Sequence, residues 1–85
     1  MPLIRRLFAD SAFDSDMVRM MGEVFDTAWG MVAPAFNAQP QSTIDEARTI
    51  LAKAILYRVG LGDQAYIVKD EAIRVLKSNY PTLPI

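Results

Sequence analysis

The chain of 85 residues contains no cysteine and no histidine, and this absence limits the ways in which so short a sequence can hold a fold. No disulfide can form, and a zinc site would have to use carboxylates alone. A chain of this length is near the lower limit at which one hydrophobic core suffices without cross-links. We therefore expect a single domain over residues 1–85 whose elements pack closely or share a surface with a partner.

Apolar residues recur in three segments at the spacing of about 3.6 residues that is typical of helices with one buried face. We therefore predict an all-α three-helix bundle. The helices are expected over about 14–33, 43–59 and 63–78, with an apolar N-terminal arm over 1–12, a loop over 34–42 and a proline-containing tail over 79–85. The pattern of the arm fits either one or two helical turns or an extended segment, and Phe36 is the expected anchor of the loop to the core.

Residues that begin or end helices stand at the borders of these segments. Asp14 is a predicted N-cap, because its carboxylate can accept hydrogen bonds from the free amides of the first turn. Thr43 and Glu46 match a capping box at the start of the second helix. Gly60 is expected to end that helix with a positive φ, and Asp63 to cap the third helix. So short a connection makes the second and third helices spatial neighbours.

The charges are balanced in total but uneven along the chain. The net charge is −1, which does not favour binding to nucleic acid or to an anionic membrane. Acidic residues predominate among the charged residues of 10–26, whereas all charged residues of 48–58 are basic. We therefore expect these two segments to face each other. Asp70 and Arg74 are expected to pair along the third helix. The longest uncharged stretch, 27–44, contains two prolines and does not fit a membrane span.

The sequence gives little support to catalysis or metal binding. Asp10, Asp14 and Asp16 suggest a calcium loop, but an EF-hand needs an oxygen ligand at its third position and glycine at its sixth. Ala12 and Ser15 stand there instead, so we predict no metal site. Without histidine, the serines and threonines lack the usual activating base, and we predict neither an enzyme nor a bound cofactor.

The excess of apolar residues suggests contact with another protein. Hydrophobic residues make up 52% of the chain, and the first helix carries four of its five methionines, a residue common at adaptable interfaces. We predict a cytoplasmic, non-enzymatic protein that acts by interaction or regulation, and its partner is either another protein or a second copy in a homodimer. The predicted contact face includes Met20, Met21, Phe25 and Trp29. The alternative is a DNA-binding accessory that uses the second and third helices as a helix-turn-helix.

Several short segments also resemble a set of small helical proteins from alphaproteobacteria that have no established activity. The matching residues are Phe13-Asp14-Ser15-Asp16, Val24-Phe25-Asp26-Thr27-Ala28-Trp29, Ala47-Arg48-Thr49-Ile50-Leu51-Ala52 and the turn from Gly60 to Asp63. Ser15 stands where those proteins often have proline. The resemblance implies a helical fold and a bacterial cytosol, and it implies no chemistry, because every matching residue also fits a cap, a turn or the core.

Overall fold

The computed structural model describes residue 8 and residues 12–85. In this part of the chain the order of elements is α2 (Ser15–Val32), the 3₁₀ turn η1 (Ala33–Phe36), α3 (Gln41–Gly60) and α4 (Ala65–Asn79), with no strand. The predicted all-α three-helix bundle is therefore confirmed. The conformation of the arm over 1–12 lies outside the described residues, apart from Phe8, which is buried, and Ala12.

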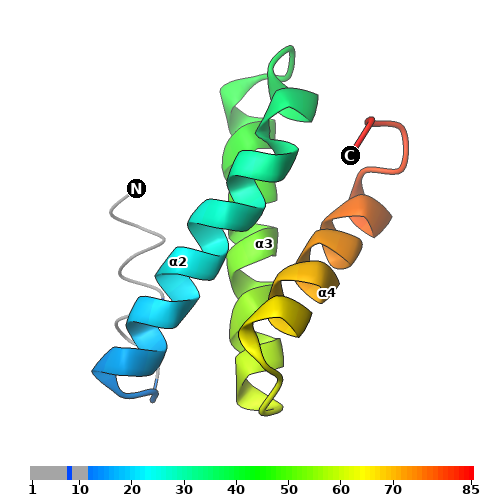
Figure 1. Cartoon of the computed structure of the whole chain (residues 1–85). Helices are drawn as coiled ribbons and strands as arrows, with labels where there is room; N and C mark the ends of the chain where they lie inside the picture. Colours follow the sequence, from blue (N-terminus) through cyan, green and yellow to red (C-terminus); the bar gives the residue numbers. More distant parts are fainter. Residues whose placement is uncertain (1–7, 9–11) are drawn as a thin grey trace.

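The three helices pack around one interior (Figure 1). α2 and α4 run in the same direction, and α3 runs in the opposite direction and lies against both of them. Because the neighbours of α3 in the chain are also its neighbours in space, each connection is short. α2 and α4 contact each other as well, so every helix has two packed sides and one side that faces solvent.

The start of α2 forms as predicted. Asp14 is the N-cap, and its Oδ1 accepts a hydrogen bond from the backbone N–H of Met17 at 2.9 Å. Phe13 and Val18, the predicted staple, both pack against the same core cluster. The helix ends at Val32, because the proline that follows two residues later disfavours further α-helix.

The predicted loop over 34–42 is mostly ordered into helical turns. Residues 33–36 form the 3₁₀ turn, which has Pro34 at its start, where the fixed φ of proline fits. α3 begins at Gln41 rather than Thr43, because the carbonyl of Pro40 already accepts the amides of Thr43 and Ile44. Thr43 therefore lies inside the first turn, and the predicted capping box is not formed.

The turn between α3 and α4 is a Schellman motif, two residues later than predicted. The amide of Asp63 donates to the carbonyl of Arg58 at 3.3 Å, and the amide of Gly62 donates to that of Val59 at 3.0 Å. Gly62 has the positive φ, 85°, that we predicted for Gly60, which instead ends the helix. Asp63 does not cap α4, whose N-cap is Gln64 without a side-chain hydrogen bond.

Two glycine substitutions should change stability in opposite directions. Gly62→Ala places a Cβ on a residue with φ of 85° and should lower the free energy of unfolding by about 1 kcal/mol. Gly30→Ala adds a Cβ to the exposed side of α2, where no described atom beyond the adjoining helix backbone lies within 4 Å, and should raise the free energy of unfolding by about 0.5–1 kcal/mol. Urea unfolding followed by circular dichroism measures both. Equal effects of the two substitutions would contradict this description of the turn.

The core consists of two adjoining clusters of buried apolar side chains. The larger one joins all three helices around Met21, Leu51 and Ile55. The smaller one lies at the end of the bundle where Phe36 packs, and it also receives the tail residues Leu83 and Ile85. Four alanines have no exposed surface and let the helices approach closely: Ala28, Ala47, Ala52 and Ala72. No polar residue is buried in the described part of the chain, so apolar packing carries its stability.

Candidate interaction surface

Two of the four predicted contact residues belong to the core. Met21 has no exposed surface and Phe25 is 3% exposed, so neither is available to a partner. Met20 and Trp29 are half-buried and border the same core cluster. This corrects the predicted contact face, and the reason is geometric: α2 packs against two helices at once, so its wide apolar stripe is largely used within the molecule.

One flank of α2 faces α3 through an arginine. The guanidinium carbon of Arg48 lies 5.0 Å from the ring centroid of Phe25 and 5.1 Å from that of Trp29. The Nε of Arg48 is buried and has no hydrogen-bond acceptor among the described residues, so the aromatic faces supply its electrostatic partner. The predicted contact between acidic α2 and basic α3 is therefore replaced here by a contact between a cation and two rings.

The opposite flank of α2 faces α4. Met17, Met20 and Met31 follow one another at helical spacing on the side of the core stripe away from Trp29. Met17 and Met20 are half-buried against the core, whereas Met31 is 61% exposed. This flank therefore carries the methionines of α2 that are at least partly open to solvent.

α4 contributes the other side of the same surface. Glu71 binds Arg58 of α3, which fixes the flank of α4 that faces α3. Tyr66, Lys69 and Ile73 lie at helical spacing on the other flank, next to α2. Tyr66 is 61% exposed, and Ile73 packs against both core clusters. We name this surface the α2–α4 face; its residues are Met17, Met20, Met31, Tyr66, Lys69 and Ile73.

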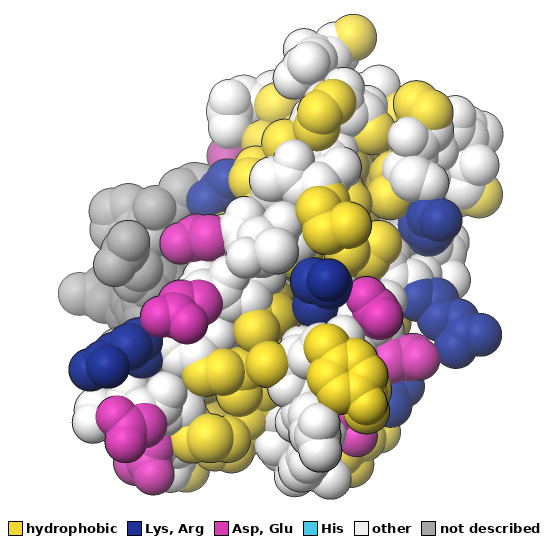
Figure 2. Space-filling model, viewed as in Figure 1, with side chains coloured by type: hydrophobic (Ala, Val, Ile, Leu, Met, Phe, Trp, Pro, Cys, Tyr) yellow, Lys and Arg dark blue, Asp and Glu magenta, His cyan; other side chains and the backbone are white. Residues whose placement is uncertain are grey.

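Figure 2 shows hydrophobic side chains gathered between α2 and the first turns of α4, with acidic side chains over α2 beside them. Asp16 and Glu23 are exposed and lie one helical turn before and one turn after Met20, on its outer side. Neither carboxylate forms an ion pair with another described residue. The α2–α4 face therefore combines exposed apolar groups with unpaired negative charge.

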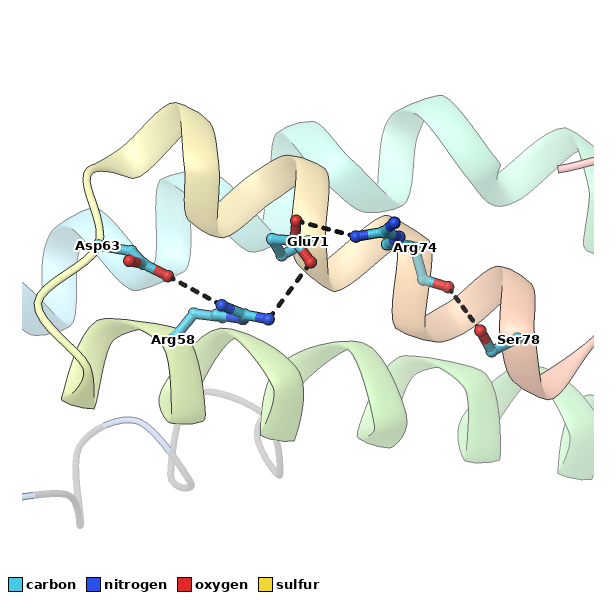
Figure 3. A network of polar contacts seen from close by, with 5 residues as sticks. All are labelled: Arg58, Asp63, Glu71, Arg74 and Ser78. Carbon is cyan, nitrogen blue, oxygen red and sulfur yellow. Dashed lines mark hydrogen bonds and ion pairs between the residues drawn. The ribbon is translucent and has the colours of Figure 1, made fainter.

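The far side of the α3–α4 pair carries a network of paired charges (Figure 3). Arg58 lies 3.4 Å from Asp63 and 3.3 Å from Glu71, and Arg74 lies 3.4 Å from Glu71. The predicted pair of Asp70 with Arg74 is not formed, because Arg74 turns toward Glu71 and Asp70 lies 3.9 Å from Lys69. The carbonyl of Arg74 accepts a hydrogen bond from the hydroxyl of Ser78 at 3.2 Å.

A polar contact joins α3 and α4 near each end of the helix pair. Arg58 and Glu71 meet near the turn, and the hydroxyl of Tyr80 donates to Glu46 at 2.7 Å at the other end. Two helices in contact at both ends form an antiparallel αα-hairpin, whereas the helices of a helix-turn-helix cross at roughly 90–120°. The geometry therefore does not favour the predicted alternative, in which α3 and α4 read DNA.

The hydroxyl of Tyr80 gives the fold a pH dependence at high pH. Burial, and then the hydrogen bond to Glu46 with its negative charge, raise the pKa of Tyr80 to about 12 from 10.0. A raised pKa in the folded state stabilises the protein fully below pH 10, and this stabilisation is lost as the pH rises through 12.

Tyr80→Phe should remove this part of the pH dependence. Between pH 10 and 12 the wild-type protein should lose stability faster than the Tyr80→Phe protein, because only the wild type must keep this phenol protonated in the folded state. Tyr57→Phe, which removes the hydroxyl of an exposed tyrosine, is the control and should lose stability between pH 10 and 12 as the wild type does. Unfolding curves at stepped pH measure the difference, and identical slopes for Tyr80→Phe and wild type would contradict the contact with Glu46.

Two further properties of the described residues bear on function. No three carboxylates among them lie close enough together to hold a metal ion. None of the helices in residues 12–85 combines the length and the apolar character that a membrane crossing requires.

Comparison with known proteins gives no relative from which a function could be transferred. The chain matches no protein family, no curated protein and no solved structure. The resemblance to small alphaproteobacterial proteins therefore stays a prediction, and the α2–α4 face has to be interpreted from its own chemistry.

The sequence pattern does not distinguish the exposed Met31 and Tyr66 from core residues. Both fit the helical period, and the period alone does not show where two helices separate and leave a side chain open. The partial signal was the width of the methionine stripe on the first helix, which exceeds one packing seam.

Proposed function

We propose that the chain is a small, non-enzymatic cytoplasmic protein that binds another polypeptide through the α2–α4 face. The observation that supports this most is that two large apolar side chains of this face, Met31 and Tyr66, are each 61% exposed, in addition to the half-buried methionines on α2. Large apolar side chains that gather on one surface and remain open to water are typical of binding surfaces. Methionine suits such a surface, because its flexible and polarisable side chain adapts to different partners.

The absence of histidine and cysteine supports a binding role over a catalytic one. The described serines and threonines have no imidazole or thiolate neighbour, and the paired arginines and carboxylates of the α3–α4 network satisfy one another. The partner is another protein or a second copy of this chain. Both would cover the same apolar groups, and the proposal requires only that the α2–α4 face is the surface covered.

The chain provides a matched pair of variants for a test. Met31→Gln/Tyr66→Ser removes the two most exposed apolar groups of the α2–α4 face. Leu61→Gln/Tyr57→Ser is the control: these side chains are 57% and 65% exposed and are not part of that face, since Tyr57 is on α3 and Leu61 is its C-cap residue. Both variants should keep the wild-type circular dichroism spectrum, because exposed substitutions change stability by about 0.5 kcal/mol or less.

The experiment is quantitative affinity capture from the native host, together with light scattering of the purified protein. We expect a protein that the wild type and the control retain and that Met31→Gln/Tyr66→Ser loses, or a dimer with the same dependence on the variants. A monomer that captures nothing in this variant-dependent way would contradict the proposal. So would a partner that is lost only with Leu61→Gln/Tyr57→Ser.

A further inference from the structure

The charges around the α2–α4 face restrict the chemistry of what can bind there. Asp16 and Glu23 line its α2 side, and Asp70 lies one turn from Tyr66 on the α4 side. Two cations accompany these carboxylates. The Nζ of Lys69 lies 3.9 Å from Asp70 Oδ1, and its side chain is 30% exposed. Arg19 is exposed on α2, one turn after Asp16 and one turn before Glu23. The half of the face around Met20 and Tyr66 is therefore negative in sum.

The other half has the opposite character. Met31 stands in the last turn of α2, and Lys77, one turn beyond Ile73, is an exposed cation in the last turn of α4. α2 and α4 run in the same direction (Figure 1), so the acidic residues of the face stand in the first half of each helix, and Lys77 stands in the last turn of α4. A bound segment therefore has a preferred orientation as well as a preferred charge.

The acidic residues beside Met20 form no ion pair with any residue in the described part of the chain. The arginines of the α3–α4 pair have other partners, since Arg58 and Arg74 contact carboxylates within that pair. Arg48 lies between two rings on the other flank of α2. Charges at the edge of an apolar surface select partners of opposite sign and speed their association, while the apolar groups supply most of the affinity.

We infer that the partner presents an amphipathic helix with an apolar stripe and basic residues on its border, which lies along the α2–α4 face with those residues next to Asp16 and Glu23. This inference rests on the proposed function, and it specifies the class of partner. A helix fits better than a strand, because the described residues offer no unpaired sheet edge, and the apolar groups lie along two helices, a geometry that suits anchors at helical spacing. A second copy of this chain fits less well, because its basic side chains on α3 are largely engaged with its own rings and carboxylates.

The probe is a synthetic helix of leucine and lysine, about 18 residues long, in which the leucines form one face. A peptide of the same pattern with glutamate in place of lysine is its match. Fluorescence anisotropy of the labelled peptides should show that the lysine peptide binds at least about tenfold more tightly. Its affinity should fall by about fivefold or more between low and physiological salt, since screening weakens exposed charge pairs.

Two pairs of variants then locate the peptide. Asp16→Asn/Glu23→Gln should weaken binding of the lysine peptide by about three- to tenfold, whereas Asp26→Asn/Asp45→Asn, with the same change in charge at exposed sites outside the face, should change it less than about twofold. Met31→Gln/Tyr66→Ser should weaken binding of the lysine peptide more than Leu61→Gln/Tyr57→Ser does. Equal effects within either pair would show adventitious charge binding and overturn the inference.

Failure of the inference can be distinguished from failure of the proposed function. A captured partner that depends on Met31 and Tyr66, but not on Asp16, Glu23 or salt, would overturn the basic helix and leave the α2–α4 face as the binding surface. If the lysine peptide and the captured proteins are all indifferent to Met31→Gln/Tyr66→Ser, both the inference and the proposed function are wrong.

Discussion

Phe36→Ala should lower the free energy of unfolding by about 3–5 kcal/mol, the range found when a buried aromatic ring is removed. Phe36 is 1% exposed, and its ring centroid lies 5.4 Å from that of Trp29 and 5.2 Å from that of Tyr80. The side chain thus joins the end of α2, the 3₁₀ turn and the tail. A domain of this size has a total stability of about 5–10 kcal/mol, so the variant should be close to unfolded at 37 °C.

The control for this prediction is an aromatic residue without packing. Tyr57→Ala removes a side chain that is 65% exposed, and it should change stability by about 0.5 kcal/mol or less. Thermal and urea unfolding, followed by circular dichroism, measure both variants. A loss of less than about 1 kcal/mol for Phe36→Ala would mean that the segment after α2 is not anchored as described.

Met21→Ala should cost about 2–5 kcal/mol, since it leaves a cavity at the centre of the larger core cluster. Met31→Ala, ten residues further along the same helix and 61% exposed, should cost about 0.5 kcal/mol or less. The comparison separates the two roles of methionine on α2, because a residue that serves only a partner contributes little to the stability of the isolated chain.

Binding should show the reverse order for the same two residues. Met31→Ala should weaken association of the α2–α4 face with its partner, whereas protein carrying Met21→Ala, where it remains folded, should keep that affinity. If Met21→Ala left stability unchanged within about 0.5 kcal/mol, α2 would not be packed as the structure shows, and the predicted contact face would have to be reconsidered.

The sequence was sufficient for features that depend on local chemistry. Three helices, the cap by Asp14 and the burial of Phe36 all follow from residue types at fixed spacing, and all are confirmed. At helix ends the predictions differ from the structure by one or two residues. α3 begins before Thr43, because the carbonyl of Pro40 accepts the first amides of the helix, and the positive φ is found at Gly62 rather than Gly60. In both places the sequence contains two nearby residues that could fill the same role.

Features that depend on packing between helices could not be predicted from the sequence. Met20, Met21 and Met31 are equivalent in an apolar pattern, and only the positions of α3 and α4 make one of them core, one half-buried and one exposed. The contacts of the arginines could not be predicted for the same reason. Arg48 contacts aromatic rings and Arg58 contacts a carboxylate of the next helix, because the register between helices decides which groups are within reach.

The most direct test of binding at the α2–α4 face is an NMR titration of protein labelled with ¹³C at the methionine methyl groups. On addition of the lysine–leucine peptide, the account predicts shifts or broadening of Met17, Met20 and Met31, with little change at the fully buried Met21. The Leu61→Gln/Tyr57→Ser protein should give the same pattern. Saturating peptide that leaves all three resonances unmoved, or that moves Met21 as much as Met31, would contradict the account.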